Sequence, residues 1–201
     1  MADRQVAPCG SWKSPIDAGR IAEGSITLRE VRLDGEDVWW IEHRPTEGGR
    51  YAVVRRGPDG AIADAIPPDF SARTRVHEYG GGSYLPRGGS VGFVNFADQR
   101  FYLLGGEGPP EPVTPADALR YADFDCDRTR HRLVAVREDH RGAGEPVNTI
   151  VAVRPHDGAG TVLVEGGDFY SSPRVSPDGS QLAWLTWNHP DMPWDAAELR
   201  V

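Results

Sequence analysis

The sequence of 201 residues predicts an all-β protein, and more specifically a partial β-propeller. Short runs of β-branched, aromatic and aliphatic residues recur along nearly the whole chain, and turn-forming residues separate them. These runs form a cycle of four. Aligning the second run of each cycle on Val38, Val91, Leu133 and Leu182 gives spacings of 53, 42 and 49 residues. Such spacings lie near the period of about 40 to 50 residues that is typical of propeller blades, each a sheet of four antiparallel strands.

Residues 1–25 are predicted to be an N-terminal segment with one short helix, Ser14–Glu23. Ser14 is a suitable N-cap and Pro15 suits the first helical position, while Gly24 can end the helix. The propeller is then expected to span residues 26–201.

The strands of the predicted blades follow from the apolar runs and from turn signals such as Asp-Gly pairs. In the first blade, 26–67, they are Ile26–Leu33, Asp37–His43, Arg50–Arg55 and Ala61–Ile66. In the second blade, 76–115, they are Val76–Leu85, Val91–Phe96, Arg100–Leu104 and Glu111–Thr114. In the third blade, 121–167, they are Tyr121–Cys126, Arg132–Arg137, Thr149–Arg154 and Thr161–Val164. The fourth blade, 171–201, contains Ser172–Ser176, Gln181–Trp187 and a strand from Glu198, so we expect about three and a half blades.

The composition disfavours several classes of function. The net charge of −8, from 22 basic and 30 acidic residues, disfavours binding to nucleic acid or to an acidic membrane surface, because both need clustered positive charge. No apolar run approaches the length of about 18 residues that a transmembrane helix needs, and the N-terminus resembles no signal peptide. Cys9 and Cys126 fit no metal or redox spacing, so we expect free thiols in a cytoplasmic protein, although a disulfide stays open.

One pentapeptide, Gly88–Gly92, matches the G-x-S-x-G pattern of serine hydrolases. That chemistry needs a sharp turn between a strand and a helix, which exposes the serine hydroxyl. Here the residues after Ser90 are strand-like and Arg87–Ser90 has the composition of a hairpin turn. We therefore expect no nucleophile at Ser90.

Two polar stretches are candidates for function. In residues 73–82 (RTRVHEYGGG), three glycines permit close approach of the backbone. This stretch is either a bend in an inner strand with Tyr79 packed, or a channel-lining patch in which His77 and Glu78 reach a ligand. Residues 137–141 (REDHR) are either a solvated loop end or, at a channel mouth, a place where Arg137 and Glu138 pair with substrate termini.

Near the C-terminus, the aromatic side chains of residues 182–194 are expected to be core or interface anchors. The segment Asn188–Asp195 within this region reads as a proline-braced loop.

The Ser176–Gly179 turn followed by Gln181–Trp184 resembles the repeat of TolB-type propellers. Four further stretches narrow the resemblance: Gly10–Ile16, Val76–Gly82, Arg137–His140 with Glu145–Asn148, and Trp187–Leu199. Together they make residues 10–201 similar to the amino-terminal propeller of prolyl oligopeptidase family serine peptidases. The similarity is to the acylaminoacyl-peptidase and dipeptidyl-aminopeptidase-like branch of that family.

The resemblance implies a propeller that limits access of peptides to an α/β-hydrolase domain with a Ser-Asp-His triad. This sequence supplies no nucleophile elbow and no triad residue, so we expect a fragment without the hydrolase domain, inactive alone, with no catalytic residue and no cofactor. The implied partners are that hydrolase domain and peptide substrates, contacted by His77, Glu78, Arg137 and Glu138.

Two alternatives stay open. The chain can be a stand-alone propeller that binds protein partners through its rims. A propeller enzyme with a metal in its channel is a third reading, but no metal-ligand spacing supports it.

Overall fold

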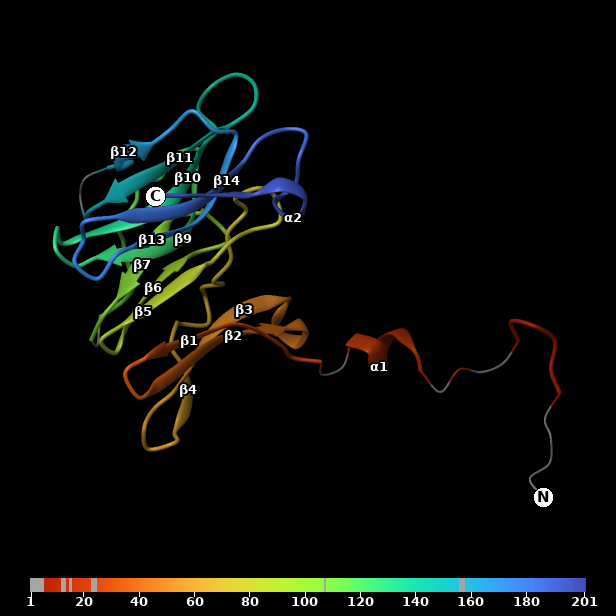
Figure 1. Ribbon diagram of the computed structural model, residues 1–201. Helices are drawn as coiled ribbons and strands as arrows, with labels where there is room; N and C mark the ends of the chain where they lie inside the picture. The colour runs from red at the N-terminus through yellow and green to blue at the C-terminus, as the bar shows by residue number, and fades with distance from the viewer. Residues whose placement is uncertain (1–5, 12–13, 15, 23–24, 107, 156–157) are drawn as a thin grey trace.

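The computed structural model describes residues 6–11, 14, 16–22, 25–106, 108–155 and 158–201. Four antiparallel sheets follow one another along the chain, and each forms one blade of a propeller-like arrangement (Figure 1). The predicted all-β propeller fold is therefore confirmed.

The sheets are named blades 1 to 4 in chain order. Blade 1 contains β1 (Thr27–Asp34), β2 (Asp37–Arg44), β3 (Arg50–Arg56) and β4 (Ile62–Asp64). Blade 2 contains β5 (Tyr84–Arg87), β6 (Ser90–Val94), β7 (Phe101–Leu104) and β8 (Glu111–Pro112). Blade 3 contains β9 (Leu119–Asp127), β10 (Arg132–Asp139), β11 (Val147–Val153) and β12 (Thr161–Val164). Blade 4 contains β13 (Phe169–Val175), β14 (Leu182–Trp187) and β15 (Glu198–Arg200).

The helices are short. The first, α1 (Ala18–Ala22), lies apart from the sheets in Figure 1 and begins later than predicted. Asp17 caps it, because its Oδ1 accepts a hydrogen bond from the backbone N–H of Arg20 at 2.8 Å. Ser14 instead accepts from the N–H of Ile16, while Pro15 and residues 23–24 lie outside the described residues.

Two further helical turns interrupt the strands. A 3₁₀ turn, η1 (Pro45–Glu47), lies between β2 and β3. The prediction of a loop over Asn188–Asp195 was partly wrong, because α2 (Pro193–Ala196) forms there. The Asp195 carboxylate accepts from the N–H of Met192 at 3.1 Å and so closes its first turn. No helix in the described part of the chain is long and apolar enough to span a membrane.

The prediction of a strand over Val76–Leu85 was also wrong, since β5 begins only at Tyr84. His77 and Glu78 have φ values of 56° and 64°, and this left-handed backbone cannot belong to an extended strand. A run of turn residues over 76–79 takes its place.

The G-x-S-x-G match forms a hairpin, as expected. Gly88 and Gly89 have φ values of 56° and 79°, the conformation of a two-residue hairpin turn, and Arg87 pairs with Ser90. Ser90 opens β6 and no helix follows it. A Cβ atom at Gly92 would lie 2.2 Å from Cζ of Phe101, so this glycine makes room for an aromatic ring.

Hydrophobic clusters lie between successive blades, as the layered packing of sheets requires. Trp39 and Ile41 of blade 1 pack with Tyr84 and Phe93 of blade 2. Between blades 2 and 3, the rings of Phe101 and Phe124 stack with centroids 3.8 Å apart. Val134, Val136 and Ile150 of blade 3 pack against Tyr170 of blade 4. Trp187 is likewise buried, whereas Trp194 is exposed.

Carboxylates tie the inner strands of neighbouring blades together. Strands β1, β9 and β13 each contain a bulge, where Glu30, Asp123 and Ser172 adopt left-handed φ values of 50°, 57° and 52°. From these bulges, Glu30 accepts the backbone N–H of Ser83 at 2.9 Å. Asp123 accepts the N–H groups of Gly82 at 2.5 Å and of Ser172 at 2.9 Å. We call these contacts the carboxylate latches; burial raises the pKa of Glu30, although the bonds from Ser83 oppose this effect.

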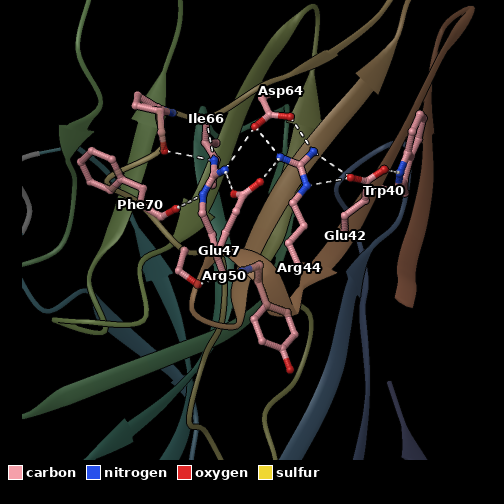
Figure 2. Close-up of polar contacts among 11 residues, drawn as sticks. Trp40, Glu42, Arg44, Glu47, Arg50, Asp64, Ile66 and Phe70 are labelled. Carbon is pink, nitrogen blue, oxygen red and sulfur yellow. Dashed lines mark hydrogen bonds and ion pairs between the residues drawn. The ribbon is translucent and has the colours of Figure 1, made fainter. Parts of the chain in front are cut away.

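Figure 2 shows a second polar network, which joins blade 1 to the loop after β4. Arg50 is 8% exposed, and its guanidinium donates to the carbonyls of Phe70 and Ile66 at 3.0 and 3.1 Å. It also pairs with Glu47 at 2.7 Å. Arg44 donates two hydrogen bonds to Asp64, and these hold the pKa of that carboxyl below its usual range.

We expect Asp123→Ala to lower the free energy of unfolding of the 201-residue chain by about 2 kcal/mol in urea titrations. Hydrogen bonds to a charged acceptor are lost, and alanine is strained at a left-handed φ. Asp123→Asn should recover part of the loss, because asparagine tolerates this φ and keeps an acceptor oxygen. Asp69→Ala is the control, since Asp69 is exposed and its side chain has no partner among the described residues. Equal losses for Asp69→Ala and Asp123→Ala would contradict the latch.

We expect Arg50→Ala to lower the free energy of unfolding by about 3 kcal/mol, because it leaves the carbonyls of Ile66 and Phe70 without their buried donor and removes ion pairs to partly exposed carboxylates. Arg50→Lys should recover little, since an ammonium group cannot reproduce the fork of the guanidinium. Arg56→Ala removes an exposed arginine from the other end of β3 and should be nearly neutral. The same urea titrations measure all three, and full rescue by lysine would refute this account of the network.

Candidate functional site

Glu138, near the end of β10, is the centre of a polar cluster and only 3% exposed. Its Oε1 accepts the backbone N–H of His77 at 2.9 Å. Its Oε2 lies 2.7 Å from Nε2 of His140 and 3.3 Å from Nη1 of Arg120, and both of these nitrogens donate to it. A buried carboxylate needs such partners, because burial without them costs several kcal/mol or more. Glu138 therefore fixes the segment that carries His77 to blade 3.

Arg120, at the start of β9, extends this cluster to the surface. Its Nη1 donates to Oε1 of Glu78 at 2.6 Å and to the carbonyl of Arg75 at 2.9 Å. The hydrogen bond from Arg120 holds the pKa of Glu78 below its usual range. Because the Glu78 side chain is 78% exposed, its negative charge faces the solvent.

The ring of His77 packs against blade 4. Its Nε2 lies 2.9 Å from the carbonyl oxygen of Tyr170, so this nitrogen carries a proton and donates it. The ring also contacts Phe169 and Trp187, with centroids 5.5 and 5.2 Å apart. These contacts offset the left-handed conformation of His77, which costs on the order of 1 kcal/mol.

Tyr79 and the glycines that follow it complete the site. Tyr79 is 54% exposed, which contradicts the alternative in which a bend packs its ring. Partial burial, together with Asp123 and Glu138, raises the pKa of its hydroxyl. The expected close approach of glycine backbone is confirmed, because a Cβ at Gly81 would lie 3.0 Å from the Cβ of Ala122.

The cluster lies at one end of the inner strands. Arg120 is near the start of β9, Tyr170 is near the start of β13, and Val76–Ser83 leads into β5. Since these three strands are neighbouring inner strands of successive blades, the side chains meet at one mouth of the ring. The mouth presents an exposed carboxylate, Glu78, beside an exposed phenol, Tyr79.

The structure brings together three of the four residues that the sequence predicted as contacts. His77 and Glu138 are buried in the cluster, and Glu78 is exposed beside it. Arg137 lies on the opposite face of β10, where its Nη1 donates to the carbonyl of Ala159 at 3.3 Å. Sequence reasoning missed Arg120, because no local pattern marks a residue that acts through partners 42 and 18 positions away.

Within the described ranges, no group of three or more His, Cys, Asp or Glu side chains lies close enough to hold a metal ion. Cys9 and Cys126 are both free thiols, as expected.

Comparison with solved structures gives strong matches. A puromycin-hydrolysing peptidase of Mycobacterium tuberculosis matches 98% of the chain with 40% identity and a TM-score of 0.85. A puromycin hydrolase matches 98% with 36% identity and the same TM-score, and a mutant of puromycin hydrolase in complex with PGG matches 96% with 37% identity. The chain spans about a third of the length of each of these proteins (33%, 33% and 32%). No protein-family model and no curated protein sequence matches the chain.

A more distant match agrees with the fold. TolB from Acinetobacter baumannii matches 87% of the chain and 40% of its own length with a TM-score of 0.56 and 11% identity, which shows a shared propeller architecture alone. The identity of 36 to 40% to puromycin-hydrolysing peptidases is far higher and extends over nearly all of the sequence. The chain therefore belongs to the prolyl oligopeptidase family, in which it corresponds to the amino-terminal propeller part.

Proposed function

We propose that this chain is the substrate-gating propeller of a serine peptidase, which limits the access of peptides to a nucleophile carried by a hydrolase domain. The matched proteins are peptidases, and the chain corresponds to their propeller part. The complex of a puromycin hydrolase mutant with PGG supports peptide binding.

The observation that supports this proposal most strongly is the polar cluster around Glu138 at the mouth of the ring. A buried carboxylate with three donors holds a strained turn in place, and the turn presents Glu78 and Tyr79 to solvent. An exposed carboxylate and phenol offer an ion pair to a peptide amino group and stacking or hydrogen bonds to its backbone. Fixed groups of this kind orient a ligand at low entropic cost.

The proposal is tested by replacing the matching third of the M. tuberculosis peptidase with this chain. The chimera should hydrolyse short peptides and lose activity as peptides lengthen, because the propeller restricts the path to the nucleophile. Steady-state kinetics over a series of peptide lengths measures this. Equal rates at all lengths would overturn gating. An inactive but folded chimera would favour a stand-alone interaction propeller.

Within the chimera, we expect Glu138→Gln to raise KM for short peptides about fivefold and to change kcat by less than about twofold, because it loosens the turn without touching the reacting atoms. Glu145→Gln is the matched control, since Glu145 is exposed and its side chain has no partner among the described residues. Unchanged kinetics, or a fall confined to kcat, would remove Glu138 as a positioning residue.

A further inference from the structure

Three arginines near the candidate site are exposed, and none forms an ion pair with a carboxylate of the described residues, although the charge of Arg75 helps to lower the pKa of Glu78. Arg29 lies on β1, and Arg73 and Arg75 lie on the segment between β4 and β5. In the described part of the chain, none of the three guanidinium groups forms an ion pair or a hydrogen bond. Such a cluster is unexpected in a chain of net charge −8.

These guanidinium groups instead lie against aromatic rings. The Cζ of Arg29 is 5.9 Å from the ring centroid of Tyr51, and that of Arg73 is 5.1 Å from the same ring. The Cζ of Arg73 is also 5.0 Å from the ring centroid of Phe96, and that of Arg75 is 4.5 Å from the same ring. We call the alternating row Arg29, Tyr51, Arg73, Phe96 and Arg75 the arginine ladder.

The backbone fixes Arg73 and Arg75 on one face. In the segment 72–76, residues 72, 74 and 76 are buried, so the two arginines between them point outward together. The N–H of Arg73 donates to the carbonyl of Val94 at 3.0 Å. The N–H of Arg75 donates to Oε1 of Gln99 at 2.7 Å. The ladder is therefore preorganised rather than a set of loose surface side chains.

The ladder is suited to carboxylates. A guanidinium stacked on a ring keeps its N–H edge free, and that edge matches a carboxylate with two parallel hydrogen bonds. Tyr51, Arg73 and Phe96 also line a cavity of about 430 Å³, which gives room beside the charges. The ladder adjoins the mouth, because the carbonyl of Arg75 accepts from Nη1 of Arg120 at 2.9 Å.

We propose that the arginine ladder binds the carboxylates of acidic peptides and so makes acidic peptides a preferred substrate class of the gated enzyme. The claim that acidic peptides are substrates rests on the proposed function, whereas the claim that the ladder binds them does not. Rows of arginine and aromatic rings also bind single-stranded nucleic acid. The overall negative charge, which repels a long polyanion, favours a short peptide with few charges.

The test measures binding of fluorescently labelled hexapeptides to the 201-residue chain by fluorescence anisotropy. A peptide with alternating Asp and Gly should bind at least about tenfold more tightly than its Asn counterpart, and added salt should weaken it. Equal affinities for the two peptides would overturn the proposal. Tighter binding of a single-stranded oligonucleotide than of the Asp peptide would also overturn it.

Variants locate the site. Replacing Arg29, Arg73 and Arg75 by glutamine should abolish the preference for the Asp peptide, whereas Arg56→Gln, at the other end of β3, should retain it. If the triple variant is unstable, Arg73→Glu alone should weaken binding of the Asp peptide and strengthen binding of a peptide with Lys in place of Asp. Asp69→Asn, which removes an exposed carboxylate that lines the same cavity, should strengthen the Asp peptide. Retention of the preference by the folded triple variant or by Arg73→Glu would refute the assignment.

The two proposals fail separately. A chimera that discriminates peptide length, together with a chain that shows no preference for acidic peptides, removes only the ladder. A ladder that binds acidic peptides, together with a chimera that cleaves all lengths equally, removes only the gate and leaves the ladder as a peptide-binding surface.

Discussion

The structure depends on how neighbouring inner strands are joined where they cannot share a regular ladder of hydrogen bonds. Among the described residues, only isolated backbone bonds join these strands, such as that from the N–H of Asp123 to the carbonyl of Gly82, so other N–H groups need a different acceptor. The carboxylate latches supply the acceptors: Glu30 reaches Ser83, and Asp123 reaches both Gly82 and Ser172. Each latch begins at a left-handed bulge, which turns a channel-side residue toward the next blade. The position of the segment 76–83 follows from these bonds.

Charged groups divide into two kinds that have different roles. Glu138 and Arg50 are buried and almost fully satisfied, and each fixes a connecting segment to a blade. The guanidinium groups of the ladder are exposed, lie over aromatic rings and form no ion pair with the described residues. The first kind specifies the fold, because removing one partner leaves a buried group without compensation. The second contributes little to stability and retains its hydrogen-bonding capacity for a ligand.

Most of the propeller could be predicted from the sequence, because alternating burial along a strand is a local property. The strand Thr161–Val164 and the start of β15 at Glu198 were predicted correctly. The segment 76–83 was not, since the left-handed turn at His77 depends on Glu138, 61 positions away. Arg137 and Glu138 were predicted together, but neighbouring strand residues face opposite sides, and the face that meets the mouth depends on how the blades pack.

The string Gly88–Gly92 shows how a functional signature arises from unrelated demands. Its first two glycines are needed for the left-handed backbone of the hairpin turn. Its last glycine is needed because the ring of Phe101 leaves no room for a side chain. The interval between them is set by the geometry of one tight turn entering one strand. In this blade, the demands of a turn and of packing thus produce a hydrolase-like pentapeptide. Phe101, on the strand paired with β6, accounts for its last glycine without any catalytic role.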